Sequence, residues 1–190
     1  MEILKEKIRQ EGKVLSDNIL KVDSFLNHQI DPALMLAIGE EFKKRFADCK
    51  ITKVLTVEAS GIAAALMTGL VLKVPVVFAK KKTPSTIPSN AYVGSIQSYT
   101  RREPVEIVVQ DAYLQPDDHV LIIDDFLATG EASSGLLNII EQSGAKLVGV
   151  GIVIEKMFQE GGHAMRKQNI RVESLVQIEG LRDGQVIFAN

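Results

Sequence analysis

Asp124 and Asp125 directly follow an apolar stretch in the segment "LIIDDFLATGEA", which runs from Leu121 to Ala132. Two neighbouring carboxylates repel each other and favour water, so a purely structural place at the edge of a core would be costly. A cationic partner, or one rich in hydroxyl groups, would remove this cost. The pattern therefore predicts a ligand site where the apolar strand gives way to the small Thr129-Gly130 turn.

The turn itself suits an anion. At the start of a helix, unpaired backbone N–H groups and the positive end of the helix dipole favour negative charge, and Thr129 adds a hydroxyl donor. Gly130 permits a close approach of the backbone or a positive φ. A phosphate group is the predicted ligand, and an ordinary turn capped by Thr129 is the alternative. The nucleotide hydrolases, whose magnesium-binding strand also ends in acids, need a Gly-x-x-x-x-Gly-Lys-Ser/Thr loop, which this sequence lacks.

Hydrophobic periodicity predicts the elements that position these residues. Helices are expected at 2–11, from Pro32 to Ala47 with Asp31 as the cap, at 61–72, at 132–144 and near 160–168. Strands are expected at 53–58, 74–79, 91–99, 105–110, 118–124 and 146–155, and residues 20–32 are expected to be irregular. Apolar strands that alternate with helices predict an α/β fold with a mainly parallel central sheet flanked by helices, and the strands between 90 and 110 add an antiparallel edge. Because ligands of such folds bind at the carboxyl ends of the strands, the loops after Glu58, Asp124 and Glu155 are the candidate site.

The composition of the 190 residues limits the function. The length predicts a single domain, residues 1–190. A net charge of −2 argues against a nucleic-acid partner, since phosphate binding usually needs a basic protein. Cys49 is the only cysteine, which excludes an intramolecular disulfide and fits a cytoplasmic location. The most apolar stretch, 59–79, is divided by polar, glycine and proline residues, so no membrane span is expected.

The segment "VLIIDDFLATGEA" closely resembles the phosphoribosyl-pyrophosphate (PRPP) motif of the type I phosphoribosyltransferase family. The motif is specific, because it combines an apolar strand, two acids, two apolar residues and a Thr-Gly turn. The segments "VDSFLNHQIDP", "EASGIAAA" and "GIVIEKMFQ" extend the resemblance over nearly the whole chain, to those members that use xanthine. The resemblance implies a homodimer, Mg²⁺ bound with PRPP, and a small hood over the base site, contributed by residues 1–31 and the C-terminal region. It also implies a flexible segment at 80–100 that closes over the reacting groups.

The resemblance also implies roles for particular residues. Asp124 and Asp125 would hold the ribose hydroxyls, and the 5′-phosphate would bind Ala128, Thr129, Gly130, Glu131 and Ala132. The loop from Glu58 to Gly61 would receive the pyrophosphate through Ser60 and Gly61, with a plain helix cap as the alternative. Lys81 would assist the pyrophosphate unless it is merely solvated.

The base site would be formed by Leu20, Asn27 and Lys156. A lysine can only donate hydrogen bonds, so Lys156 should favour an oxopurine over adenine, although a solvated lysine at a strand end is the alternative. Asn27 offers both a donor and an acceptor, which suits a base with alternating N–H and C=O groups.

The implied reaction transfers the 5-phosphoribosyl group from PRPP to N9 of xanthine, giving xanthosine 5′-monophosphate and diphosphate in purine salvage. Asp124, Asp125 and Glu58 are the catalytic candidates. Ala128 stands where hypoxanthine–guanine relatives have an aspartate, which leaves the general acid or base unassigned. A guanine or hypoxanthine phosphoribosyltransferase remains an alternative, and so does a non-enzymatic PRPP-sensing regulator, although the sequence shows no N-terminal helix-turn-helix.

Overall fold

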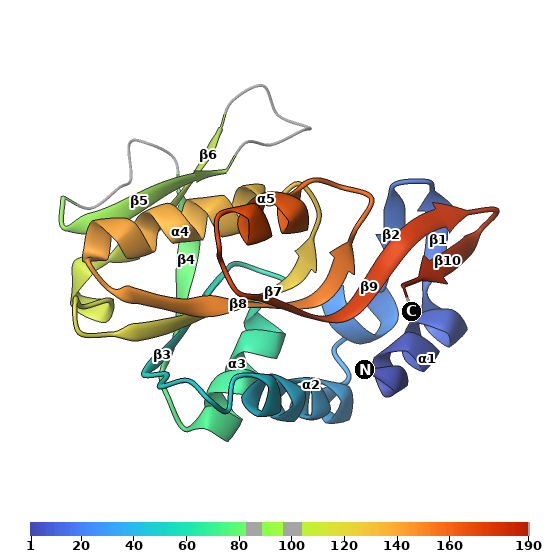
Figure 1. Cartoon of the computed structure of the whole chain (residues 1–190), viewed down its shortest axis with the longest axis horizontal. Coiled ribbons are helices and arrows are strands. Elements are labelled where there is room, and N and C mark those ends of the chain that lie inside the picture. The colour runs from blue at the N-terminus through green and yellow to red at the C-terminus, as the bar shows by residue number, and fades with distance from the viewer. Residues whose placement is uncertain (83–88, 97–103, 190) are drawn as a thin grey trace.

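The computed structural model of the chain describes residues 1–82, 89–96 and 104–189 (Figure 1). Its main sheet has eight strands in the order β10-β9-β8-β7-β3-β4-β6-β5. The strands from β9 through β4 run parallel, and β10, β6 and β5 are antiparallel to their neighbours. The α/β class with a mainly parallel sheet and an antiparallel edge, which the sequence predicts, is confirmed. The strands are β3 (Lys53–Val57), β4 (Val76–Lys82), β5 (Ala91–Ile96), β6 (Val105–Gln110), β7 (His119–Leu127), β8 (Lys146–Lys156), β9 (Val172–Arg182) and β10 (Gln185–Phe188).

Helices cover both faces of this sheet (Figure 1). The helices are α1 (Glu2–Glu11), α2 (Pro32–Arg45), α3 (Ile62–Leu72), α4 (Glu131–Ser143) and α5 (Gly161–Lys167). α2 and α3 lie on one face and α4 and α5 on the other, each side with its own buried apolar cluster. α2 begins as predicted, because the Asp31 carboxylate accepts the backbone N–H groups of Ala33 and Leu34. Within the described residues, no helix is both long and apolar enough to cross a bilayer.

Both ends of the chain contain elements that the periodicity does not predict. A small hairpin pairs β1 (Lys13–Ser16) with β2 (Ile19–Lys21), and a π-helix, Asp23–Asn27, lies inside the stretch expected to be irregular. β9 and β10 follow the last predicted helix, and polar residues scattered along β9 conceal its strand pattern. The amino group of Met1 donates to the Leu175 carbonyl at 2.7 Å, so the N-terminal segment packs on β9.

Two strands run further than the sequence indicates. β7 is expected to end at Asp124 but continues to Leu127, because β8 pairs with it as far as Leu127. Asp124 and Asp125 therefore lie inside a strand and not in the loop that follows it. β4 likewise continues through Lys81 to Lys82, paired with β6. Within the expected closing segment, 80–100, residues 91–96 form β5, and residues 83–88 and 97–100 lie outside the described residues.

The strand order reverses between β3 and β7, which are neighbours in the middle of the sheet. β3 leads through α3 to β4 on one side, and β7 leads through α4 to β8 on the other side. Because the two crossovers diverge here, a crevice forms outside the carboxyl ends of these strands, where ligands of open α/β sheets bind. Asp124 and the loop after β3 both lie at this point.

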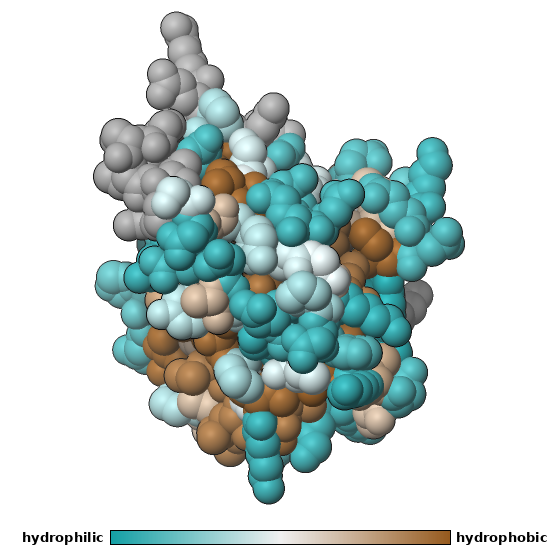
Figure 2. All heavy atoms as spheres, turned by 90° about the vertical axis from the view of Figure 1, so that its left-hand side faces the viewer, coloured by the Kyte–Doolittle hydropathy of each residue, from teal (hydrophilic) through white to brown (hydrophobic). Residues whose placement is uncertain are grey.

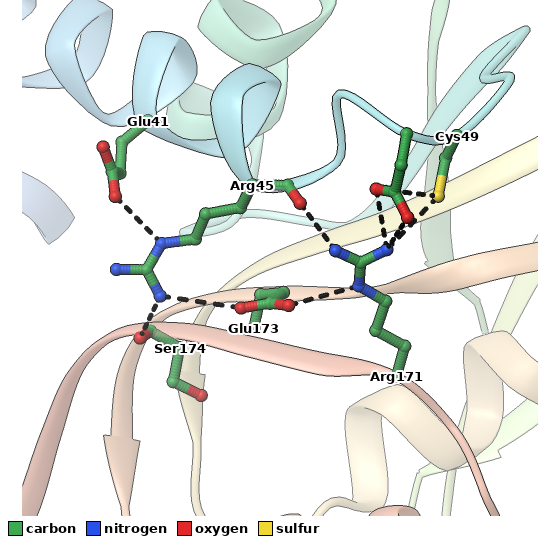
Figure 3. Close-up of polar contacts among 7 residues, drawn as sticks. Glu41, Arg45, Cys49, Arg171, Glu173 and Ser174 are labelled. Atoms are coloured by element: carbon green, nitrogen blue, oxygen red, sulfur yellow. Dashed lines mark hydrogen bonds and ion pairs between the residues drawn. The ribbon is translucent and has the colours of Figure 1, made fainter.

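Arg171, just before β9, ties the end of α2 to the sheet (Figure 3). Its Nη1 donates to both carboxylate oxygens of Asp48 at 2.9 Å, and its Nη2 donates to the Arg45 carbonyl at 2.6 Å. Its Nε pairs with Glu173, and its guanidinium lies 4.8 Å from the centre of the Phe46 ring. The last carbonyls of a helix lack intrahelical partners and carry the negative end of its dipole, so the guanidinium stabilises the end of α2.

Arg171→Ala should lower the free energy of unfolding by about 1–3 kcal/mol, because it leaves these acceptors without their donor. For a chain of this length each kcal/mol corresponds to roughly 2–4 °C in Tm, which thermal unfolding followed by circular dichroism resolves. Arg171→Lys is the matched control. It keeps the charge but loses the planar fork, so its Tm should fall between the other two. An alanine variant with the Tm of the wild type would contradict the assignment.

Candidate functional site

Asp124 and Asp125 lie side by side near the carboxyl end of β7, with only 4% and 6% of their surfaces exposed. Asp124 Oδ1 accepts the backbone N–H of Asp125 at 3.0 Å. Burial, followed by the charge of Asp125, raises the pKa of Asp124 well above its ordinary value, while the charge of Lys81 opposes the rise. A buried carboxyl pair of this kind gains most from a ligand that brings hydrogen-bond donors or positive charge.

The loop after β3 reaches these acids, as the sequence predicts. The peptide bond between Glu58 and Ala59 is cis. A methyl group on Gly61 would lie 2.3 Å from Thr56 Oγ1 and 2.6 Å from Asp124 Oδ1, so only glycine lets the start of α3 come this close. Ser60 does not act as a plain helix cap, because Gly61 is the N-cap residue and no side-chain cap bond forms. The N–H of Ile62 donates to the Ala59 carbonyl at 3.2 Å, and the next N–H groups in the first turn of α3, which lack intrahelical partners, suit an anion beside Asp124.

Glu58 and Lys81 connect this loop to β4. The backbone N–H of Lys81 donates to Glu58 Oε1 at 2.6 Å. Lys81 also lines a hollow of about 720 Å³ together with Asn27 and Ser60. Two of the predicted pyrophosphate residues, Ser60 and Lys81, thus share one hollow, and the Glu58 carboxylate holds the strand that carries Lys81.

The turn after β7 has the geometry of an anion site. Gly130 is the N-cap of α4 with a φ of 87°, a conformation that favours glycine, and no side-chain cap bond forms there. Thr129 is therefore not the cap of this helix. The N–H of Gly161 donates to the Ala128 carbonyl at 2.9 Å, and a methyl group on Gly161 would lie 2.6 Å from both Ala128 O and Gly130 N. The first residue of α5 therefore braces the turn from behind.

Lys156 closes β8 beside this turn. Its ammonium donates to the backbone carbonyl of Asn18 at 2.7 Å and lies 5.4 Å from the centre of the Phe126 ring. Burial lowers the pKa of Lys156. The residue lines a second hollow, of about 640 Å³, which also takes in the predicted phosphate residues Ala128, Thr129 and Glu131. Lys156 is thus held against the protein, which disfavours the solvated alternative.

The other two base-site candidates, Leu20 and Asn27, do not line the hollow of Lys156. Leu20 is buried within β2, two residues after Asn18 in the chain. Asn27 is exposed at the end of the π-helix and lines the hollow of Ser60. Asn18, which the sequence pattern does not single out, contacts Lys156 instead. The sequence gives no sign of this contact, because Asn18 and Lys156 are far apart in the chain.

Glu155, which is only 2% exposed, and the more exposed Arg166 form a clamp that the motifs do not reveal. Arg166 Nη1 and Nη2 donate to the two oxygens of Glu155 at 2.6 and 2.7 Å, and Ser174 and Gln177 donate to the same carboxylate. Burial alone would raise the pKa of Glu155, but these bonds outweigh it and hold the pKa below its ordinary value. The pair joins α5 to the end of β8, and a methyl group on Gly162 would overlap Glu155. The clamp therefore supports the helix that braces the phosphate turn.

Glu155→Gln should lower the free energy of unfolding by about 1–3 kcal/mol near pH 7, because it breaks a doubly bonded ion pair whose carboxylate is buried. The folded pKa lies below the unfolded one, so this contribution is complete above the unfolded pKa of about 4.3. It is lost as the pH falls through the lower folded pKa. Urea unfolding of both proteins at several pH values measures the difference, and a difference independent of pH would contradict the assignment.

Within the described residues, no three His, Cys, Asp or Glu side chains gather closely enough to hold a metal ion by themselves. A divalent ion at Asp124 and Asp125 would need further oxygen ligands from a bound substrate or from water.

Comparison with known proteins supports the resemblance seen in the sequence. The chain is 69% identical over 190 residues to a xanthine phosphoribosyltransferase of Moorella thermoacetica, covering 100% of this chain and 97% of that protein. It is 56% identical over 188 residues to one of Oceanobacillus iheyensis, covering 99% of this chain and 97% of that protein. No family model matches the chain.

Solved structures share the fold. An adenine phosphoribosyltransferase of Trypanosoma brucei superposes with a TM-score of 0.76 at 22% identity, covering 92% of this chain and 79% of that chain. One of Rhodothermus marinus gives 0.73 at 23% identity, covering 94% of this chain and 100% of that chain. The predicted type I phosphoribosyltransferase fold is confirmed. On the strength of its full-length relatives, the chain belongs to the xanthine phosphoribosyltransferase family.

Proposed function

We propose that this chain transfers the 5-phosphoribosyl group of PRPP to N9 of xanthine in cytoplasmic purine salvage, giving xanthosine 5′-monophosphate and diphosphate. The observation that carries the proposal is the buried pair of Asp124 and Asp125, which lies between two helix starts. One start, at Gly61, suits the pyrophosphate, and the other, at Gly130, suits the 5′-phosphate. The ribose would then lie over the acids, which accept its 2′- and 3′-hydroxyl hydrogens.

The same arrangement supports catalysis by positioning and charge. As the bond from the ribose to pyrophosphate breaks, positive charge develops on the sugar ring, as in glycoside cleavage. Asp124 and Asp125 lie where they would stabilise that charge, and donors at Ser60 and Gly61 would stabilise the leaving group. Glu58 is our candidate to accept the proton from the base, and its bond to the Lys81 N–H fixes it at this edge of the sheet.

Mg²⁺ fits this site as a partner of PRPP. Asp124 and Asp125 supply hard oxygen donors at a buried position, which Mg²⁺ favours. They would hold the ion through water while PRPP provides its other ligands. When bound, Mg²⁺ supplies positive charge that offsets the charge of the departing diphosphate.

The base would bind under a hood formed by residues 1–31 and the C-terminal strands, which pack together through Met1 and β9. Lys156 would donate to the six-position oxygen, with Leu20 as an apolar wall. Asn27 would read the two-position oxygen, which distinguishes xanthine from hypoxanthine. This arrangement predicts that xanthine is preferred over hypoxanthine, which lacks the two-position oxygen.

Asn27→Ala should reduce the ratio of kcat/KM for xanthine over that for hypoxanthine by roughly 5- to 150-fold, because a contact worth about 1–3 kcal/mol is lost. Lys156→Ala should lower kcat/KM for every oxopurine while leaving the ratio unchanged. Steady-state kinetics with both bases measures these effects. An unchanged ratio in Asn27→Ala would exclude Asn27 as the specificity residue.

The proposed function itself is tested by product formation from PRPP and Mg²⁺ with xanthine, hypoxanthine, guanine and adenine in parallel. The highest kcat/KM is expected for xanthine. A higher value for guanine or hypoxanthine would assign the chain to those bases instead. If PRPP bound but no base reacted, the enzyme assignment would fail and a PRPP-sensing regulator would be favoured.

The outer face of α3 supports a homodimer. Leu66 and Leu70, one turn apart, are 53% and 62% exposed, and α3 is apolar on every side. Figure 2 shows apolar surface gathered low in the view, at the height of α3 in Figure 1. Leu66 also lines the hollow of Ser60 and Lys81, so a second copy seated on α3 would close one side of the pyrophosphate site. We propose a second copy of this chain as the occupant.

Light scattering should give the wild type twice the chain mass of 20.8 kDa. The double variant Leu66→Asp/Leu70→Asp should be monomeric, because two charges would be buried in the interface. Tyr113→Asp is the control: this side chain is 58% exposed on another surface, and the variant should remain a dimer. A monomeric wild type would contradict the proposal.

A further inference from the structure

Thr56 carries a buried hydroxyl that bonds to nothing. The side chain is 0% exposed, and among the described residues its Oγ1 and Glu106 Oε2 are the buried side-chain polar atoms without a hydrogen-bond partner. An unpaired buried oxygen destabilises a fold, and valine would fill the same volume without this cost. The hydroxyl therefore needs an explanation other than stability.

Its position supplies one. Thr56 lies on β3, the strand that pairs with β7. Its Oγ1 and Asp124 Oδ1 border the same small space beside Gly61, at 2.3 and 2.6 Å from the point that a methyl group on Gly61 would occupy. The hydroxyl is thus beside the Asp124 carboxylate without being bonded to it. Because Gly61 has no side chain, this space stays open.

Thr68 shows what an ordinary buried threonine does in this protein. It is also 0% exposed, but its hydroxyl donates to the Ala64 carbonyl one turn earlier in α3, at 2.8 Å. Thr56 lies in a parallel strand, where the neighbouring backbone carbonyls take part in the sheet. The acceptor next to it is therefore a carboxylate of the candidate site.

We propose that Thr56 is a positioning residue for Asp124: its hydroxyl donates to the Asp124 carboxylate when PRPP occupies the site and turns that carboxylate toward the ribose hydroxyls. This hydrogen bond is stronger when the Asp124 carboxylate is charged, since hydrogen bonds to ionised acceptors are about twice as strong as neutral ones. Residues far from the reacting atoms act in this way by fixing the rotamer of a group that touches substrate. The inference rests on the proposed role of Asp124 with PRPP.

Three variants test it: Thr56→Val removes only the hydroxyl, Thr56→Ser keeps it, and Thr68→Val removes a hydroxyl that already has a partner. Thr56→Val should lower kcat/KM for PRPP by about tenfold, as expected for one lost charge-assisted hydrogen bond. It should also raise Tm, because an unpaired polar atom is gone. Thr56→Ser should recover most of the activity. Thr68→Val should lower Tm, because it removes a hydrogen bond, and should leave kcat/KM unchanged.

Thr56→Val with the kcat/KM and PRPP affinity of the wild type would overturn the inference. A fall in both Tm and activity without recovery in Thr56→Ser would also overturn it, since a packing defect would then explain the loss. Calorimetric titration with Mg²⁺ and PRPP separates this result from failure of the proposed function. If the wild type turned over no base, the function would fail, while the PRPP affinities of wild type and Thr56→Val would still decide the role of Thr56.

Discussion

The burial of two adjacent carboxylates at the carboxyl end of β7 is the constraint around which this structure is arranged. Only 4% of the surface of Asp124 and 6% of that of Asp125 is exposed, although burying two ionised carboxylates together destabilises a fold. The protein places the pair at the junction of β3 and β7, where the crossovers diverge and a ligand can reach it. Gly61 brings the start of α3, with its free N–H groups, against Asp124. The cost of burying the acids is thus compatible with a ligand that carries hydroxyl groups between two anions.

Side-chain contacts fix the elements that surround this pair. The clamp of Glu155 and Arg166 fixes α5, and Gly161 at its start contacts the turn after β7, which we propose as the 5′-phosphate site. Arg171 fixes the end of α2 on the opposite face of the sheet. These contacts join segments that are distant in the chain, and they hold the donors in place before substrate binds. Such preorganisation is what electrostatic catalysis requires.

The central part of this fold could be read from the sequence, because its strands are apolar, its helices are regular and Asp31 caps α2. The motif around Asp124 also predicts a turn between a strand and a helix, and the structure has this turn between the end of β7 at Leu127 and the start of α4 at Glu131. The hairpin of β1 and β2 and the strands β9 and β10 escape the same reasoning, because polar residues interrupt their pattern. The contacts of Asn18 with Lys156 and of Thr56 with the space beside Asp124 depend on how distant segments meet. No local pattern encodes such meetings.

The proposed function requires Asp124 to be a buried carboxyl that becomes a ribose ligand, and NMR titration can follow the ionisation of this group. Protein labelled with ¹³C at the aspartate carboxyl carbons, with Asp124→Asn used to assign the signal, would be titrated alone and with Mg²⁺ and PRPP. We expect a pKa for Asp124 above its ordinary value in the free protein, and a lower pKa in the complex, because ribose hydroxyls and the positive charge of Mg²⁺ favour the ionised form. An Asp124 that titrates at the ordinary value and is unaffected by PRPP would contradict the proposed role of Asp124.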